Sequence, residues 1–122
     1  MAGTINHGAL MDSIQKSLEP KNNPAKWTYE RVAKMINDFE ENLDADQEIG
    51  LFLVGTPTSV MHVMDVKYWG PDLMIFEGVD SNSKPMKFVQ HHSQLSLLLT
   101  AASKVEEKAR RIGFHLMSRL RD

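Results

Sequence analysis

Apolar residues recur with two different periods along this chain, and the change of period separates helical from extended parts. At 9–19 and again at 24–44 they return every three or four positions, as in an amphipathic helix. Between 48 and 101 they form short continuous or alternating runs bounded by turn residues, which indicates β-strands. At 104–120 the helical period returns, so we predict helices on both sides of a block of strands.

The helix predicted at 24–44 has the best-marked start. Asn23 is a favourable N-cap, and Pro24 suits the first helical position because its missing N–H needs no partner there. Its apolar stripe consists of Val32, Met35, Ile36, Phe39 and Leu43. The segment at 9–19 ends at Pro20 and is either a docked helix or a mobile arm. We therefore divide the chain into an N-terminal arm, 1–21, and a single domain, 22–122.

Four strands are predicted at 48–55, 60–68, 73–79 and 85–92, with turns between them. The segment 95–101 is either a fifth strand or the start of a helix. The last helix, 104–120, is predicted to begin with a capping box formed by Ser103 and Glu106. Its expected apolar stripe is Val105, Ala109, Ile112, Leu116 and Leu120. Strands grouped between helices predict an α+β fold with a four- to five-stranded antiparallel bent sheet or a small barrel.

Composition restricts the possible chemistry. The 122 residues are 42% hydrophobic and include no Cys, which excludes disulfides, Cys-based zinc sites and thiol nucleophiles. The N-terminus lacks the basic start and apolar core of a signal peptide, and the longest apolar run, 95–102, is too short to cross a bilayer. We therefore expect a cytoplasmic protein without a membrane segment or a cofactor.

The net charge of −2 conceals an acidic block in the middle of the chain. From Met35 to Val66 there are seven acidic residues and no Lys or Arg. Such a block is either a solvated face or a surface that attracts a basic partner. The residues predicted to bind a partner are Glu40, Glu41, Asp44, Asp46 and Glu48.

The predicted C-terminal helix has the opposite charge. One of its faces is a basic stripe made of Lys104, Lys108, Arg111, His115 and Arg119. This stripe is interpreted either as a solubilising face or as a surface for nucleic acid or for a neighbouring copy of the chain.

His91 and His92 are the most evident potential metal ligands. Adjacent strand residues point to opposite faces, so both imidazoles are not expected to hold one ion. We predict no metal site, with one His buried and hydrogen-bonded and the other facing solvent or a partner. Trp69, in the turn at 69–72, is interpreted as an aromatic anchor over the sheet, and the alternative is an exposed binding hot spot.

The sequence contains none of the common catalytic motifs, such as a P-loop, G-x-S-x-G, G-x-G-x-x-G or H-E-x-x-H. We therefore predict no catalytic residues and a role other than that of an enzyme.

Three stretches are notable together: NNPAKWTYER at 22–31, YWGPD at 68–72 and QHHSQLS at 90–96. Together they resemble a family of small bacterial and phage-borne proteins of uncharacterised function. The resemblance covers about 22–102 and implies a shared fold rather than a chemistry.

A second resemblance is topological. A helix followed by five short bent strands is similar to the Sm-like barrels, including the bacterial Sm-like RNA chaperone. That resemblance implies rings that bind RNA through a His near the end of the fourth strand, where His91 or His92 stands. Gln90 occupies the place of the lysine that usually precedes this His, which weakens a phosphate contact.

Three functional hypotheses follow. The first is a non-enzymatic, self-associating protein-binding module of phage type that inhibits a host defence complex, such as a CRISPR effector, through its acidic surface. The bound partner would then be a basic, nucleic-acid-binding complex. The second is an Sm-like RNA-binding oligomer, and the third is a structural homo-oligomer assembled by pairing opposite charges.

Overall fold

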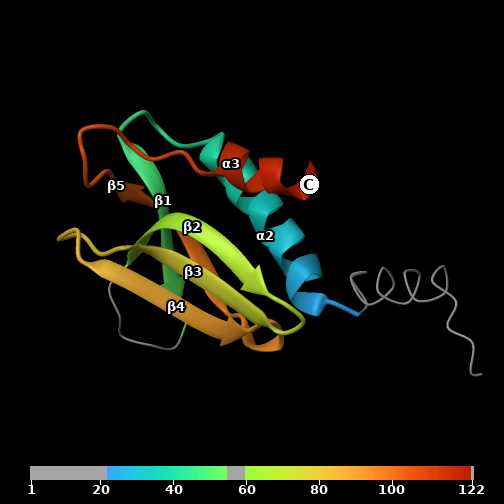
Figure 1. Ribbon diagram of the computed structural model, residues 1–122. Helices are drawn as coiled ribbons and strands as arrows, with labels where there is room; N and C mark the ends of the chain where they lie inside the picture. Colours follow the sequence, from blue (N-terminus) through green and yellow to red (C-terminus); the bar gives the residue numbers. More distant parts are fainter. Residues whose placement is uncertain (1–21, 55–59, 122) are drawn as a thin grey trace, which may run out of the picture.

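The computed structural model describes residues 22–54 and 60–121, in which a long helix, a sheet and a short C-terminal helix follow one another (Figure 1). The predicted helix at 9–19 and turn at 55–59 lie outside the described residues. The elements are, in order, α2 (Pro24–Glu40), β1 (Gln47–Leu53), β2 (Met61–Trp69), β3 (Leu73–Val79), β4 (Pro85–His91), η1 (His92–Gln94), β5 (Leu97–Ser103), α3 (Gly113–Ser118) and η2 (Arg119–Arg121).

The strands form one antiparallel sheet in the order β4-β3-β2-β1-β5. β1 pairs with β5 along its whole length, but its register with β2 is limited to Gly50↔His62 and Leu51↔Met61. Beyond these pairs β2 leaves β1 and continues with β3 and β4, so the sheet curls into a half-barrel (Figure 1). The predicted α+β fold with a bent antiparallel sheet is confirmed, and the ambiguous segment at 95–101 lies largely in β5.

The two helices pack on one face of this sheet. The residues of α2 that are buried are Ala25, Tyr29, Ala33, Ile36 and Glu40. Of the predicted stripe, Ile36 is buried and Val32 and Phe39 are partly buried, but Met35 is exposed. Alanines let a helix approach its neighbours closely, so small residues mark the line of contact better than the largest apolar ones do.

α2 ends at Glu40, about one turn before the predicted end at 44. The last turn contains no basic residue, and acidic side chains there oppose the negative end of the helix dipole. The helix therefore ends where continued winding would place more carboxylates at its C-terminus.

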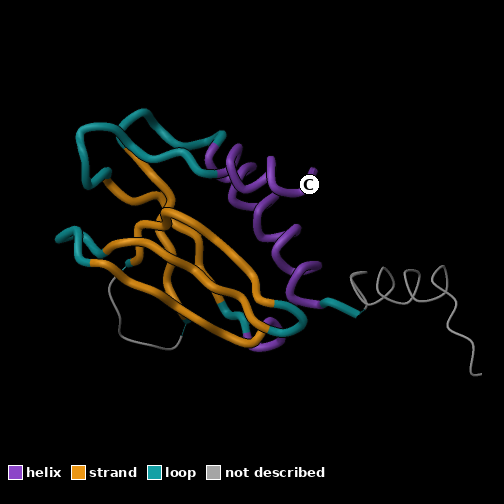
Figure 2. The backbone as a smooth tube through the Cα atoms, in the orientation of Figure 1, coloured by secondary structure: helices purple, strands orange, loops and turns teal. Residues whose placement is uncertain are grey.

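The C-terminal segment departs most from its prediction. α3 spans only Gly113–Ser118, so the helix predicted at 104–120 is wrong, and so is its capping box. Ser103 is instead the last residue of β5 and pairs with Gln47. The segment 104–112 is a loop that connects β5 to α3 (Figure 2).

Tertiary contacts of its backbone explain why this loop is not helical. Lys104 N donates to Asp46 O at 2.9 Å, and Arg110 N donates to Glu48 Oε1 at 2.9 Å. Within a helix at 104–120 the Arg110 N–H would donate to the carbonyl of residue 106, whereas the Lys104 N–H, at the helix start, would have no partner in the helix. The bonds of both donors to the β1 region override the local helical period.

Candidate functional site

Three segments distant in the sequence meet at one corner of the molecule: the start of α2, the β2–β3 turn and the end of β4. Ala25 N donates to Pro71 O at 2.8 Å, and His92 N donates to Asp72 O at 2.8 Å. These are the stretches 22–31, 68–72 and 90–96 noted in the sequence. We call this arrangement of the three stretches the Trp69 corner.

The turn of the Trp69 corner fits closely against the N-cap of α2. Asn23 Oδ1 accepts a hydrogen bond from Lys26 N at 3.3 Å and so satisfies one of the free donors of the helix. A Cβ added at Gly70 would lie 2.5 Å from the same oxygen atom, so a side chain at this position would collide with the cap. The start of α2 and the β2–β3 turn thus both pack against the Asn23 side chain.

One carboxylate and two imidazoles lie together at this corner. Asp72 Oδ1 is 3.7 Å from His91 Nε2, and the rings of His91 and His92 stack with their centroids 4.6 Å apart. One donor atom from each of the three residues lies within 4.8 Å of the others. The expectation that His91 and His92 point to opposite faces is therefore wrong.

The reason lies in where β4 ends. His91 is the last residue of this strand and His92 begins η1, so the alternation of side chains stops between them. The argument from alternation against a shared ion consequently does not apply to this pair.

An apolar patch lies beside this cluster on the face of the sheet turned away from the helices. Strand register places Trp69 beside Leu73, and Ile75 beside Val89. Trp69 is 72% exposed and Val89 50% exposed. We call these four residues the Trp69 patch. The interpretation of Trp69 as an anchor that covers the sheet is wrong, because this side chain extends into solvent.

A ladder of charges bounds the patch on the same three strands. Glu77 on β3 accepts from Lys67 Nζ at 2.8 Å and from Lys87 Nζ at 3.1 Å. The two ammonium groups hold the pKa of Glu77 below its ordinary value, and the pKa of Lys67 is raised in return. The patch thus has an apolar centre and a polar, internally paired rim.

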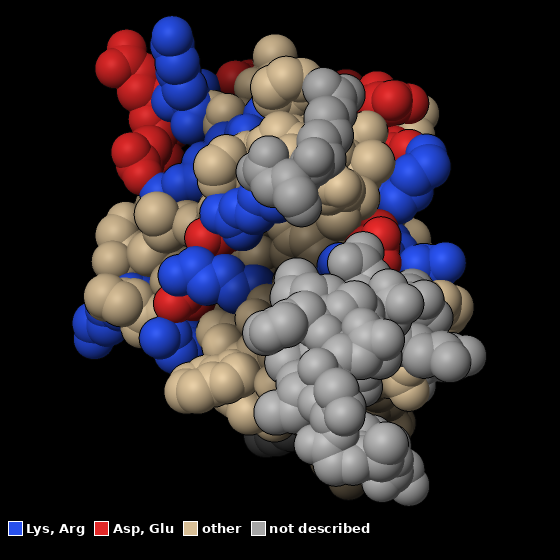
Figure 3. Space-filling view, turned by 45° about the vertical axis from the view of Figure 1, so that its right-hand side comes forward, with Lys and Arg blue, Asp and Glu red and all other residues tan. Residues whose placement is uncertain are grey.

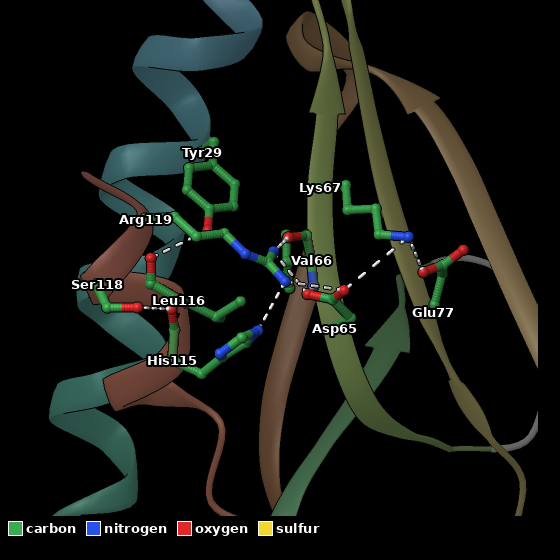
Figure 4. A network of polar contacts seen from close by, with 9 residues as sticks. All are labelled: Tyr29, Asp65, Val66, Lys67, Glu77, His115, Leu116, Ser118 and Arg119. Atoms are coloured by element: carbon green, nitrogen blue, oxygen red, sulfur yellow. Dashed lines mark hydrogen bonds and ion pairs between the residues drawn. The ribbon is translucent and has the colours of Figure 1, made fainter. Parts of the chain in front are cut away.

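A hollow of about 440 Å³, which we call the Arg119 hollow, lies between α2, β2 and η2. Its lining residues are Lys26, Tyr29, Glu30, Lys67, Tyr68, Arg119 and Leu120. Arg119 spans it: Nη1 and Nη2 donate to the two carboxylate oxygens of Asp65 at 2.7 and 3.1 Å (Figure 4). Nη1 also donates to Val66 O at 2.9 Å, on the edge of β2 that β1 has left.

Two polar groups that line this hollow, the Arg119 guanidinium and the Tyr29 hydroxyl, are bound to neighbouring parts of the chain. Hydrogen bonding to Asp65 raises the pKa of Arg119, and burial raises the pKa of the Tyr29 hydroxyl, which donates to Leu116 O at 3.0 Å. Arg119 thus closes the open edge of β2, and its contacts are those of a residue that stabilises the fold.

Two of the five acidic residues predicted to bind a partner are buried and do not contribute to a surface. Glu40 is 8% exposed, and its two oxygens accept from Ile112 N and Gly113 N, each at 2.8 Å. Glu48 is 1% exposed and contacts His62. Both carboxylates are buried because they bind donors of the chain itself.

The other three acidic residues, Glu41, Asp44 and Asp46, are exposed. Asp46 forms an ion pair with Lys104 at 3.0 Å. On the face shown in Figure 3, acidic and basic side chains of the described residues form small mixed groups. The acidic block of the sequence is therefore divided in space.

The predicted basic stripe is divided too, because the helix that would align it is absent from 104–112. Arg111 donates to Gln47 O at 2.6 Å and to Asp44 O at 3.0 Å, and Arg119 binds Asp65. Lys108 and His115 are exposed, and His115 Nε2 lies 2.8 Å from Arg119 Nη2. Three of the five side chains, counting Lys104, are thus occupied by contacts that hold the fold.

Residues 21–115 match a family of unknown function, DUF6173. The chain belongs to this family. No curated protein and no solved structure matches it. Within the described residues, no helix is long and apolar enough to span a bilayer.

The family match distinguishes the Trp69 corner from the Arg119 hollow. The Trp69 corner lies wholly within 21–115, whereas Arg119 and Leu120 of the Arg119 hollow lie beyond it. The Asp72 carboxylate and the His91 imidazole also lie 3.7 Å apart, whereas Arg119 binds both carboxylate oxygens of Asp65. We therefore take the Trp69 corner as the candidate site of this DUF6173 protein.

Sequence reasoning missed Asp72 and three patch residues, Leu73, Ile75 and Val89. The alternation within β3 and β4 indicates two-faced strands, but alternation does not specify which face the helices cover. The available signal was the turn sequence itself, in which Trp69 precedes Gly70 and Pro71, because a bulky aromatic beside a tight turn is seldom fully covered.

Proposed function

We propose that this protein is a non-enzymatic protein-binding module whose contact surface is the Trp69 patch. The supporting observation is the 72% exposure of Trp69 on an apolar part of the sheet. Tryptophan is the residue type most enriched at binding hot spots, because it buries a large rigid surface at a small entropic cost.

The surroundings of Trp69 fit this role. A hot spot is effective where its neighbours exclude water, and Leu73, Ile75 and Val89 extend the apolar area across two further strands. The Lys67–Glu77–Lys87 ladder supplies the polar rim typical of such surfaces. A small pocket of about 250 Å³, lined by residues 69–73, lies beside the indole and suits an apolar side chain of the partner.

The finer hypothesis concerns the identity of the partner. Inhibition of a host defence complex, such as a CRISPR effector, remains our proposal for the biological setting. In the form predicted from sequence, binding uses Glu40, Glu41, Asp44, Asp46 and Glu48, of which only Glu41, Asp44 and Asp46 are exposed. We propose the Trp69 patch as the principal contact and the three exposed carboxylates as a secondary one.

Site-specific photocrosslinking in the native host cells tests the proposal. A benzophenone amino acid at position 89 leaves Trp69 intact and lies within the patch, and the same group at Leu98 on β5 is the matched control. Val89 and Leu98 are 50% and 53% exposed, so the two probes meet solvent equally. We expect a discrete protein adduct at position 89 that is absent at 98 and is lost on Trp69→Ala.

Two results would contradict the proposal. An adduct that survives Trp69→Ala, in a variant whose circular dichroism is unchanged, would exclude the patch as the contact surface. An adduct at position 89 that disappears after ribonuclease treatment would instead support the Sm-like RNA-binding hypothesis.

A further inference from the structure

We propose that Asp72, His91 and His92 form a zinc-binding site at the Trp69 corner. The inference does not rest on the proposed protein-binding function, because it concerns the affinity of the isolated chain for a metal ion. Three metal-binding atoms lie close together at this corner, and backbone hydrogen bonds hold the residues that carry them.

The donor atoms are close enough to share one ion with little movement. Two ligands on one zinc ion, each about 2.0–2.2 Å from the metal, are separated by roughly 3–3.5 Å in tetrahedral geometry. Asp72 Oδ1 and His91 Nε2 are 3.7 Å apart, and the three donors lie within 4.8 Å of one another. Small side-chain rotations are sufficient to close the remaining gaps.

The backbone holds the ligands in place from two sides. Asp72 lies in the β2–β3 turn and His91 ends β4, while the hydrogen bond from His92 N to Asp72 O at 2.8 Å joins the two segments directly. The β2–β3 turn is also joined to the start of α2, because Ala25 N donates a hydrogen bond to Pro71 O. A site whose ligands are held by ordered backbone loses little entropy when an ion binds.

Ser93 is positioned to orient the His91 ring. Its Oγ lies 2.8 Å from His91 Nδ1, and its backbone N lies 3.2 Å from the same atom. In the metal-free chain His91 Nδ1 accepts the Ser93 backbone N–H, so the ring proton lies on Nε2. Binding of a metal by Nε2 moves this proton to Nδ1, from which it is donated to Ser93 Oγ. This is the second hydrogen bond that metal-bound histidines generally form, and it fixes the ring tautomer.

The donor set selects the class of metal. Two imidazoles and one carboxylate suit zinc better than magnesium or calcium, which prefer oxygen ligands. Asp72 and His91 have side chains that are 51% and 43% exposed, so water has access to complete the coordination. The three protein ligands thus leave a fourth position open.

Isothermal titration of the full chain, without an affinity tag, with zinc chloride tests this assignment. We expect one equivalent of zinc, and a visible d–d absorption when cobalt replaces zinc. Asp72→Asn, His91→Asn and His92→Asn should each weaken zinc binding by about 100-fold or more, since even second-shell changes cost about 10–100-fold. Ser93→Ala should weaken it by about 10-fold.

Two other histidines provide matched controls. His115→Asn removes an exposed imidazole that lies on α3, and His7→Asn replaces the histidine at position 7 of the sequence. Both variants should bind zinc as the unsubstituted chain does.

Tryptophan fluorescence locates the ion independently. Trp69 and His91 lie in one cross-strand row with Leu73 between them, which places the two backbones about 10 Å apart at the usual strand spacing. In a Trp27→Phe background, cobalt should quench Trp69, and Asp72→Asn should abolish the quenching.

The proposal is overturned if the chain takes up no zinc, if zinc binding survives both Asp72→Asn and His92→Asn, or if His115→Asn removes it. These results are distinguishable from a failure of the protein-binding proposal. The titration needs no partner, and the crosslink at position 89 needs no metal.

Discussion

Residues 22–54 and 60–121 contain two contacts of a carboxylate with a histidine, and these differ in whether the chain itself satisfies the polar groups. In the first, Glu48 Oε2 lies 2.7 Å from His62 Nδ1 while Oε1 accepts from Arg110 N, and both side chains are buried. In the second, Asp72 and His91 are exposed and their nearest polar atoms are 3.7 Å apart. A carboxylate and an imidazole therefore form a buried hydrogen bond in the first case, and in the second they are exposed and not hydrogen-bonded to each other.

The difference follows from the cost of removing a charge from water. A buried carboxylate is tolerated only when several donors replace its hydration, and Glu48 has donors from both β2 and the 104–112 loop. At the Trp69 corner water supplies this hydration, so the chain need not saturate Asp72. A metal ion needs side-chain atoms that are held in place and have no partner within the chain. For this reason we assign zinc binding to Asp72 and His91 and not to Glu48 and His62.

Removing each carboxylate in turn should separate the two contacts most strongly. Glu48→Ala leaves His62 and Arg110 without their partner in the interior, which typically costs about 3–5 kcal/mol. Asp72→Ala, at an exposed position, should change stability by no more than about 0.5 kcal/mol. Urea unfolding followed by circular dichroism measures both.

Glu48→Gln keeps the side-chain volume and provides a milder variant if Glu48→Ala does not fold. Equal losses in the Glu48 and Asp72 variants would show that burial does not distinguish the two contacts.

Periodicity was sufficient to predict the fold class and failed where long-range polar contacts decide the structure. The strands were predicted nearly in place because their apolar runs are short and separated by turns rich in Gly, Pro, Asp and Ser. The helix at 104–120 was wrong because its helical period is local, whereas the bonds from Arg110 to Glu48 and from Lys104 to Asp46 join segments far apart in the sequence.

The same limitation applies to the candidate site. His91, His92 and Trp69 were noted from the sequence, yet their joint position was not. It depends on the end of β4 at His91 and on the turn that brings Asp72 beside it. The acidic block illustrates the opposite error, since a run of like charges gives no indication that Glu40 and Glu48 point inward.

Glu40 and Glu41 extend the comparison to adjacent residues at the end of α2. Glu40 accepts from the backbone N–H groups of Ile112 and Gly113 at the start of α3, whereas Glu41 is exposed. Glu40→Gln exchanges one acceptor oxygen for an amide that faces a donor, which should cost about 1–3 kcal/mol. Glu41→Gln should stay within about 0.5 kcal/mol of the unsubstituted protein.

Thermal unfolding of both variants at neutral pH measures this difference. A Glu40→Gln variant as stable as Glu41→Gln would mean that α3 does not depend on the Glu40 carboxylate. A Cβ at Gly113 would lie 2.5 Å from Asn37 Cα and 2.7 Å from Glu40 Oε1, so Gly113→Ala should push α3 away from the end of α2 and destabilise the protein more than Glu40→Gln does.

The smallest expected effect distinguishes two partly buried carboxylates, Glu77 and Asp80, whose hydrogen-bond donors differ. The pKa of Glu77 is lowered by the side chains of Lys67 and then of Lys87, whereas the pKa of Asp80 is lowered chiefly by backbone N–H groups of Lys84 and Asn82. Because both pKa values are lower in the folded state, the stabilisation they give is present above the ordinary carboxyl pKa and is lost as pH falls through the folded value.

Salt should separate these two carboxylates. At about 1 M salt the screening length is about 3 Å, so the pKa of Glu77 should rise toward its ordinary value while that of Asp80 stays low. Lys67→Gln should raise the pKa of Glu77 more than Lys87→Gln does, and neither should move Asp80. Carboxyl-carbon NMR titration measures all of these values, and a parallel rise of both pKa values in salt would contradict the assignment of Asp80 to backbone donors. The backbone donors stay in place in salt because they belong to the turn itself, with Asn82 N 2.8 Å and Lys84 N 3.0 Å from Asp80 Oδ1.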